Sequence, residues 1–167
     1  MEMPLEKANE PTFFVDAMLG NIAKKLRLMG YDSLYFSDIN DDELIQLAKK
    51  DERIIISRDE DLIRKSIKYG IKSVVTKGST EIEQFRDILK KTNLKIIEIN
   101  ADRARCPNCN SKTQSIDKKN ILQKIPTKVL EYNDKFWECK SCNQIFWEGT
   151  HIKNLQKFVG ELNERKC

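Results

Sequence analysis

Short apolar segments alternate with helix-like segments between residues 12 and 99, and this alternation constrains the fold more than any other feature. The segments with strand character are 12–15, 31–36, 53–57, 71–75 and 94–99. Two of them, IIIS and SVV, are almost continuously apolar, as strands covered on both faces are. Alternation of this kind predicts an α/β domain with a parallel sheet between two layers of helices.

The helical segments carry their own start and stop signals. The first has apolar residues at helical spacing and ends at Gly30. Asp41 or Asp42 can cap the second helix, because a side-chain oxygen there can accept a free amide hydrogen of the first turn. Thr80 and Glu83 have the spacing of a capping box before the fourth helix.

The pattern changes after residue 101. Residues 103–147 carry four of the five cysteines and few helical signals, whereas 151–164 return to helical spacing. The sequence therefore predicts a parallel α/β domain over 12–100, a small metal-binding module over 101–150, and a closing helix over 151–164 that packs back on the first domain.

Two Cys-x-x-Cys pairs stand about thirty residues apart in the small module. Cys106 and Cys109 belong to CPNC, and Cys139 and Cys142 belong to CKSC. Two such turns can place four thiolates in a tetrahedron around Zn²⁺. The alternatives are chance pairs or a redox dithiol, which would stand alone near a βαβ unit. Four protein ligands leave no open position, so the predicted zinc is structural.

The basic surplus of the chain lies in the same module. Residues 103–142 contain nine Lys and Arg against four Asp and Glu, although the whole chain has a net charge of only +4. Candidate phosphate contacts are Arg103, Arg105, Lys118 and Lys119. Such cations beside aromatic residues suit single-stranded nucleic acid. The alternative is a solvated basic surface with the aromatics Phe136, Trp137, Phe146 and Trp147 as a small core, and for the aromatics we favour the core.

Carboxylates follow several of the predicted strands. They are Asp16, Asp38, Asp41, Asp42, Asp59 and Asp61. Carboxyl ends of parallel strands meet at one edge of a sheet, so these groups should gather there. Oxygen ligands without His or Cys suit Mg²⁺ or Mn²⁺, and two such ions can act on a phosphodiester. Each acid has a structural alternative as a helix cap, a first-turn residue or a turn residue.

Several classes of protein are excluded by what the sequence lacks. No apolar run approaches the roughly 20 residues that cross a bilayer, so no membrane contact is expected. The first residues have no apolar core of a secretion signal, which favours a cytoplasmic location and reduced cysteines. The oligomeric state is left open.

Four runs of sequence together resemble the Mut-seven C-terminal RNase family. They are FFVDAMLGNIAKKLRLMGYD, DINDDELIQLAKKDERIIISRDEDLI, RARCPNCN and WECKSCNQIFWEGTH. The resemblance covers about residues 12–162. It implies a PIN-like nuclease domain with an added zinc ribbon near the C-terminus.

The resemblance also implies functional residues. Asp16 matches the acid after the first strand, and Asp59 and Asp61 match the acids of a T-x-D-x-D turn, with Ser57 in place of Thr. The middle acid is Asp41, with Asp42 and Asp38 as rivals. These acids would hold catalytic Mg²⁺ or Mn²⁺.

Polar residues outside this set have both functional and structural interpretations. Asn21 and Arg27 can face the site or form ordinary surface. Arg58 can contact a phosphate or pair with a neighbouring acid. His151 can act as a general acid, but a hydrogen bond that orients the junction between the two domains is the interpretation we favour.

The sequence thus predicts a metal-dependent ribonuclease, which, as the resemblance implies, acts on single-stranded RNA. The alternative is a non-catalytic RNA-binding or ribosome-associated zinc-ribbon protein. Neither the RNA nor the choice between endonuclease and exonuclease follows from these residues.

Overall fold

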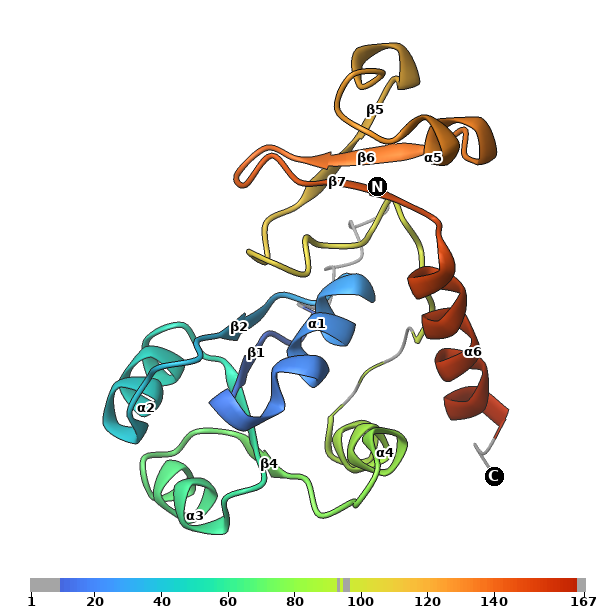
Figure 1. Ribbon diagram of the computed structural model, residues 1–167. Coiled ribbons are helices and arrows are strands. Elements are labelled where there is room, and N and C mark those ends of the chain that lie inside the picture. The colour runs from blue at the N-terminus through green and yellow to red at the C-terminus, as the bar shows by residue number, and fades with distance from the viewer. Residues whose placement is uncertain (1–9, 93, 95–96, 165–167) are drawn as a thin grey trace, which may run out of the picture.

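The computed structural model describes residues 10–92, 94 and 97–164. Its main sheet has four parallel strands in the order β2-β1-β3-β4 (Figure 1). The strands are β1 (Phe13–Val15), β2 (Ser33–Tyr35), β3 (Ile54–Ser57) and β4 (Ser73–Val75). The predicted parallel α/β architecture is confirmed.

Helices cover both faces of this sheet. Their bounds are α1 (Gly20–Leu28), α2 (Asp41–Lys50), α3 (Glu60–Lys68), α4 (Glu81–Lys91) and α6 (Thr150–Glu164), with a short 3₁₀ turn η1 (Ala17–Leu19) before α1. Helices α1, α4 and α6 pack with Phe13, Val15 and Ile56 on one face. Helices α2 and α3 pack with Phe14 and Ile55 on the other. Alternate residues of each strand therefore build two separate cores, as the two-residue period of a strand requires.

The helix starts agree with the sequence at one cap and differ at another. Thr80 and Glu83 form the predicted capping box of α4. Helix α2, in contrast, is capped by Asn40, whose side-chain oxygen accepts the Glu43 amide hydrogen at 2.9 Å. The prediction that Asp41 or Asp42 caps this helix is therefore wrong. Both carboxylates lie in the first turn instead.

A fifth strand was predicted over 94–99. The described residues of this segment do not pair with any strand of the sheet. Positions 95 and 96 lie outside the described residues, and Leu94 and Ile97–Ile99 are not in a strand. The Ile97 carbonyl accepts a hydrogen bond from the Asn163 side chain of α6 at 3.2 Å, and the Ile97 side chain is buried against the α1/α4/α6 core. The segment therefore serves as a connection under α6.

Residues 104–147, which we call the ribbon, form the predicted small module. Its antiparallel sheet has the order β5-β6-β7, with β5 (Thr113–Ile116), β6 (Phe136–Cys139) and β7 (Ile145–Trp147). A 3₁₀ turn η2 (Lys118–Asn120) and a short helix α5 (Thr127–Tyr132) connect β5 to β6. One face of the sheet carries a small core of Ile121, Leu130, Phe136 and Ile145, with Trp147 packed against it.

The ribbon sits beyond the end of the main sheet at which the strands begin. Asn110 of the ribbon contacts Asp32 and Ser33 at the start of β2, and Pro107 contacts Arg27 at the end of α1. Figure 1 shows the ribbon at the end of the molecule where α1 finishes. After the ribbon, α6 returns to the main domain, where Val159 and Leu162 join the core of the α1/α4/α6 face.

Among the helices of the described residues, none combines the length and the apolar character that a membrane span requires.

Candidate active site and tetracysteine metal centre

The strand order creates a crevice between β1 and β3. These strands are neighbours, but β1 leads into α1 on one face of the sheet and β3 leads into α3 on the other. Where adjacent strands send their connections to opposite faces, a cleft opens beyond their carboxyl ends, and α/β proteins bind ligands there. Asp16 follows β1 and Asp59 follows β3, so the two acids flank this cleft.

A buried hydroxyl joins these two acids. Ser57 is fully buried, and its Oγ donates to Asp16 Oδ2 at 2.7 Å and accepts the Asp59 amide hydrogen at 2.9 Å. The other oxygen of Asp16 accepts the Ala17 amide hydrogen at 2.7 Å. Asp59 caps α3 by accepting the amide hydrogens of Asp61 and Leu62. Both carboxylates are therefore oriented by the backbone around them.

Asp41 is the third member of this group. Partial burial raises its pKa, and the charges of Asp59 and Asp16 raise it further. A carboxylate whose pKa responds to both acids lies within electrostatic range of both. We call Asp16, Asp41 and Asp59 the carboxylate cluster.

The other predicted acids and Arg58 are exposed, and two of these acids form ion pairs. Asp42 pairs with Lys65 at 2.5 Å. Asp61 is exposed and pairs with Arg64 one turn along α3. Asp38 is exposed in the loop before α2. Arg58, between Ser57 and Asp59, is also exposed and makes no ion pair within the part of the chain that the structure describes.

The carboxylate cluster is looser than a closed metal cage. Among the described residues, the group whose ligand atoms all lie within 4.8 Å of one another is the tetracysteine group, not a set of acids. Carboxylates repel each other without a cation between them, and this repulsion adds to the effect of burial in raising the pKa of Asp41. The donor set of hard oxygens fits Mg²⁺ or Mn²⁺, which bind through few carboxylates and keep several waters.

The tetracysteine group unites the two predicted pairs. The Sγ atoms of Cys106 and Cys142 are 3.6 Å apart, and those of Cys109 and Cys139 are 3.4 Å apart. Four sulfurs at about 2.3 Å from a tetrahedral Zn²⁺ would be about 3.8 Å from each other. The four cysteines could therefore hold zinc with only small adjustments, and they fit the zinc ribbon that the sequence predicts.

The two cysteine turns have the same backbone geometry. Each begins with a cysteine whose carbonyl accepts, at 2.8 Å, the amide hydrogen of the residue after the second cysteine. That residue is Asn110 in one turn and Asn143 in the other, and both have positive φ angles, 69° and 60°. Asparagine tolerates this left-handed conformation better than other residues except glycine. Asn after each Cys-x-x-Cys pair was thus a sequence signal that reinforces the metal-binding interpretation.

In the absence of a cation, the surroundings shift the pKa values of Cys106 and Cys109 in opposite directions. Burial raises the pKa of Cys106, whereas hydrogen bonds from Ser111 lower the pKa of Cys109 to about 6. Four adjacent sulfurs cannot all carry charge in this space unless a cation compensates them. The arrangement therefore fits a metal that binds thiolates.

Comparison with known families identifies one match over most of the chain. The family model of the Mut7-C RNAse domain matches residues 11–159. The chain belongs to the Mut7-C RNAse domain family. Membership indicates a nuclease, with RNA as the substrate class that the family name implies. Searches of curated proteins and of solved structures give no match.

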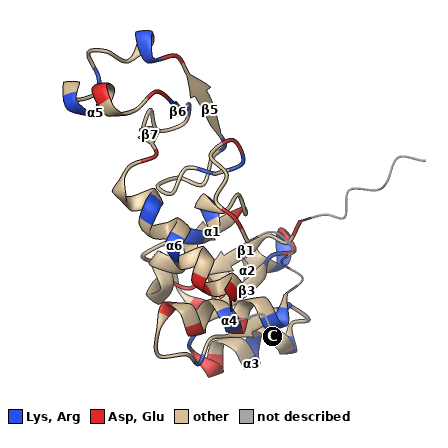
Figure 2. Ribbon diagram, turned by 90° about the vertical axis from the view of Figure 1, so that its right-hand side faces the viewer, with Lys and Arg blue, Asp and Glu red and all other residues tan. Residues whose placement is uncertain are grey.

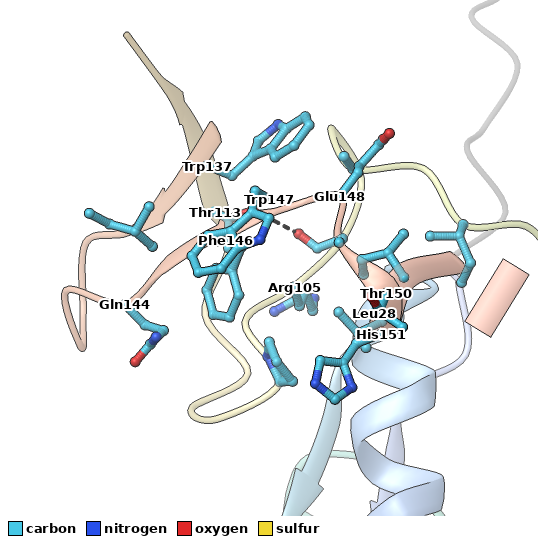
Figure 3. Close-up of a pocket in the computed structure, with 17 residues that line it drawn as sticks. Leu28, Arg105, Thr113, Trp137, Gln144, Phe146, Trp147, Glu148, Thr150 and His151 are labelled. Atoms are coloured by element: carbon cyan, nitrogen blue, oxygen red, sulfur yellow. Dashed lines mark hydrogen bonds between the residues drawn. The ribbon is translucent and has the colours of Figure 1, made fainter. Parts of the chain in front are cut away.

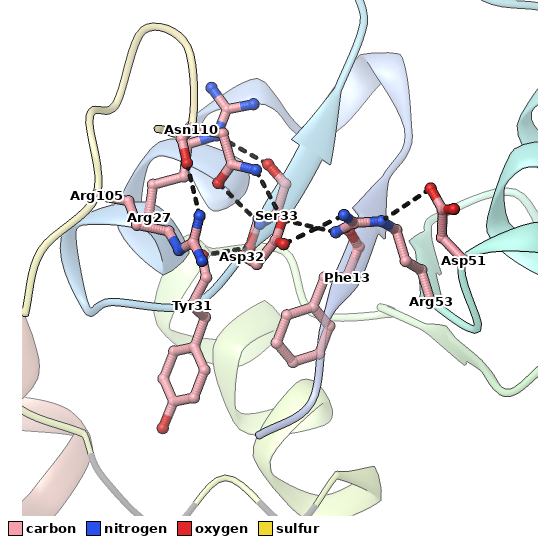
Figure 4. A network of polar contacts seen from close by, with 9 residues as sticks. All are labelled: Phe13, Arg27, Tyr31, Asp32, Ser33, Asp51, Arg53, Arg105 and Asn110. Atoms are coloured by element: carbon pink, nitrogen blue, oxygen red, sulfur yellow. Dashed lines mark hydrogen bonds and ion pairs between the residues drawn. The ribbon is translucent and has the colours of Figure 1, made fainter. Parts of the chain in front are cut away.

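In this Mut7-C RNAse domain, a polar network connects the ribbon to the main sheet (Figure 4). Asp32 receives a two-pronged contact from Arg53, at 2.7 and 3.2 Å, and a hydrogen bond from Asn110 Nδ2 at 2.7 Å. Asn110 Oδ1 in turn accepts the Ser33 amide hydrogen at 3.0 Å. The side chain of Asn110, the residue with positive φ in the first cysteine turn, therefore hydrogen-bonds to the backbone at the start of β2. The backbone of a neighbouring strand would make the same kind of contact.

Arg27 belongs to this network and not to the carboxylate cluster. It is buried, and it donates to the carbonyls of Ser33 and Pro107, both at 2.8 Å. Its own carbonyl accepts the Arg105 amide hydrogen at 2.8 Å. The interpretation of Arg27 as a site or surface residue is therefore wrong, and Asn21 is exposed on α1.

The predicted RNA-contacting cations are divided between two places. Arg103 stacks on Tyr31, with its guanidinium carbon 5.1 Å from the ring centre, and it forms an ion pair with Glu10. It also packs over Gly30, because a β-carbon at Gly30 would lie only 2.5 Å from Cγ of Arg103. Arg105 donates to the Asn110 carbonyl at 2.9 Å. Both therefore have structural partners. Lys118 and Lys119 lie in η2 on the outer part of the ribbon, where Figure 2 shows Lys and Arg beyond β5.

Proposed function

We propose that this chain is a divalent-metal-dependent ribonuclease that hydrolyses phosphodiester bonds of single-stranded RNA at the carboxylate cluster. The observation that carries the proposal is the hydrogen-bonded link from Asp16 through Ser57 to the Asp59 backbone at the switch point of the sheet. Family membership supports nuclease chemistry.

Asp16, Asp41 and Asp59 would hold one or two Mg²⁺ or Mn²⁺ ions, and Asp61 would join them by leaving its pair with Arg64. The bound cations would activate a water and compensate the charge that develops on the phosphate. The chain's own contribution is orientation. Ser57 orients Asp16 by a charge-assisted hydrogen bond. Because Asp42 forms an ion pair with Lys65, Asp41 is the acid of α2 that is available to the cleft.

Arg58 has a separate role in this proposal. Its side chain is exposed, and Arg58 lies between Ser57 and Asp59 in the sequence, directly after β3. A guanidinium there can bind a phosphate oxygen with two parallel hydrogen bonds. The cysteines would hold a structural Zn²⁺ that stabilises the ribbon.

The decisive experiment is RNA cleavage by purified protein with Mn²⁺ and with EDTA. We expect Mn²⁺-dependent cleavage of single-stranded RNA that leaves 5′-phosphate and 3′-hydroxyl ends, the products expected of a PIN-type nuclease. Asp16→Asn and Asp59→Asn should reduce the rate at least about 100-fold, the lower range of what electrostatic groups contribute in active sites. Asp42→Asn is the matched control and should retain most activity.

Two outcomes would overturn this proposal. Full activity in both Asp16→Asn and Asp59→Asn would mean that the cleavage comes from a contaminant or from another site. RNA binding that survives EDTA, without cleavage under any divalent cation, would support the non-catalytic RNA-binding alternative.

A further inference from the structure

A cavity of about 520 Å³ lies where the ribbon, the end of α1 and the start of α6 meet (Figure 3). Its walls are mostly apolar, and they include three aromatic side chains, Trp137, Phe146 and Trp147. Its volume falls within the range of small-molecule sites in proteins, roughly 300–1,000 Å³. The carboxylate cluster lies at the opposite end of the strands, so this cavity is a separate feature.

Two of the aromatics face away from the ribbon's own core. In the antiparallel register, Trp137 of β6 is paired with Phe146 of β7, so both side chains lie on the same face of the ribbon sheet. Phe136 and Trp147 are also paired, on the face that carries the small core. The expectation that all four aromatics form the ribbon core is therefore correct for Phe136 and Trp147, but not for Trp137 and Phe146.

The aromatic wall is held in place. Trp137 is largely buried, and its indole Nε1 donates to Asp102 Oδ1 at 3.3 Å. Phe146 is half-buried beside it. A flat apolar wall with a fixed orientation suits a planar ring more than a flexible aliphatic chain.

A few polar groups surround this wall. Arg105, Glu148 and His151 line the cavity, and Figure 3 shows the Arg105 side chain between Phe146 and the first turn of α6. No hydrogen bond of the His151 side chain is found among the described residues, so the predicted junction bond is not seen there. Arg105 offers hydrogen-bond donors and Glu148 offers acceptors, the two kinds of group that read the edges of bases.

We propose that this cavity binds one unpaired nucleobase of a single-stranded RNA, stacked on Phe146 and Trp137. Charge favours nucleic acid over an apolar peptide, because residues 103–142, which supply Arg105 and Trp137 to the cavity wall, carry five more positive than negative charges. The inference rests on the proposed function for the identity of the polymer. It adds a second anchor for the strand, remote from the bond that is cut.

Both tryptophans of the chain line this cavity, so their fluorescence reports its occupancy. The binding experiment uses the full chain carrying Asp16→Asn, in EDTA at 50 mM salt, with single-stranded oligoadenylate as the probe. The tetracysteine metal is checked by metal analysis after dialysis. We expect saturable quenching by oligoadenylate and none by an abasic oligomer of the same length.

Phe146→Ala tests the wall, and Tyr132→Ala is the matched control, since Tyr132 is an exposed aromatic on α5 of the same ribbon. Removing one stacking partner should weaken binding about tenfold, whereas the control should bind as the parent protein does. If Phe146→Ala does not fold, as judged by circular dichroism, Glu148→Gln on the exposed rim replaces it and should change the preference between adenine and cytosine oligomers. Equal quenching by the abasic oligomer, or equal affinity of the wall, rim and control variants, would overturn the proposal.

Failure of this inference can be separated from failure of the proposed function. Cleavage by the wild-type protein without base-dependent quenching would leave the nuclease and remove the cavity site. Base-dependent quenching without any cleavage would leave the cavity site and remove the nuclease. In an active enzyme, Phe146→Ala should raise the KM for long RNA and leave kcat unchanged, and it should leave the cleavage of a dinucleotide unaffected.

Discussion

At the scale of single residues, one hydroxyl connects the chemistry of two strands. Ser57 is the last residue of β3, and it contacts Asp16 beyond β1 and the backbone of Asp59. The sequence predicted Asp16 and Asp59 because each follows the end of an apolar strand, Asp16 directly and Asp59 after Arg58. It ranked Asp41 ahead of Asp42 and Asp38 only through the family resemblance, because neighbours on a helix differ by about 100° in direction and the Asn40 cap that sets the start of α2 was not predicted.

Replacing Ser57 by alanine should loosen both acids. Asp16 Oδ2 loses its donor and the Asp59 amide loses its acceptor, so we expect unfolding to become easier by about 1–3 kcal/mol. Ser57→Thr keeps the hydroxyl and is the control. Urea denaturation of both variants measures the difference, and equal stability of Ser57→Ala and wild type would show that the link is unimportant.

Neutralising Asp41 should slightly stabilise the protein in the absence of divalent cations. Folding raises the pKa of Asp41, so its charged form opposes folding at neutral pH, and that opposition disappears as pH falls through the raised value. We expect Asp41→Asn to gain no more than about 0.5 kcal/mol, the usual range for surface sites.

The same variant should lose stabilisation by Mn²⁺. Thermal melts with EDTA and with Mn²⁺ measure both effects, and Asp42→Asn is the control that should still respond to the cation. A Mn²⁺-dependent rise of Tm in Asp41→Asn as large as in wild type would remove Asp41 from the site.

At the scale of elements, the connection between ribbon and sheet was the part that sequence reasoning missed. Local patterns predicted the four strands, the helices of the main domain and both cysteine turns, because each depends on nearby residues. The contacts of Arg27, Asp32 and Asn110 join segments about 80 residues apart. The spacing of apolar residues in a sequence does not indicate contacts over such a distance. The unpaired segment near Ile97 was misjudged for the same reason, since its apolar residues pack under α6.

Asp32→Asn should weaken this connection in a pH-dependent way. Partial burial alone would raise the pKa of Asp32, but hydrogen bonds from Arg53 and Asn110 outweigh it and lower the pKa below the ordinary value of 3.8. The carboxylate therefore stabilises the fold above pH 3.8, and its contribution is lost as pH falls below that value.

We expect Asp32→Asn to cost about 1.5–3 kcal/mol at pH 7, the range for hydrogen bonds to charged groups, with a smaller difference from wild type at pH 3. Urea denaturation at the two pH values measures this. Asp134→Asn, on the exposed ribbon surface, is the control and should change little. A loss that is equal at both pH values would contradict the assignment.

At the scale of the whole molecule, the two predicted metal sites lie at opposite ends of the same short strands. The tetracysteine site contacts the start of β2, and the carboxylate cluster follows the ends of β1 and β3. The sequence predicted both sites and their ligands but contained no signal for their relative position. An RNA that contacts the basic residues of the ribbon and the acids at the same time therefore has to be long enough to pass along the sheet domain.

Removing the tetracysteine metal should disturb the start of the main sheet and leave its far end largely unchanged. With the ribbon disordered, Ser33 and Arg27 lose their partners Asn110 and Pro107. We expect the amides of β2 to exchange hydrogen faster after chelation, and the amides of α3 to keep their protection. Hydrogen exchange with mass spectrometry measures this, with re-added Zn²⁺ as the reversal. Uniform loss of protection would show that the two ends are not separable.

The position of α6 after the ribbon has a consequence for the order of synthesis. Val159 and Leu162 complete the core of the α1/α4/α6 face, yet they leave the ribosome only after every cysteine of the two turns has emerged. The parallel domain therefore remains open on one side while the ribbon acquires its metal. If the ribbon folds only with the proposed Zn²⁺, a cell short of zinc would accumulate complete chains whose main domain is still open, and chaperones and proteases would bind them first.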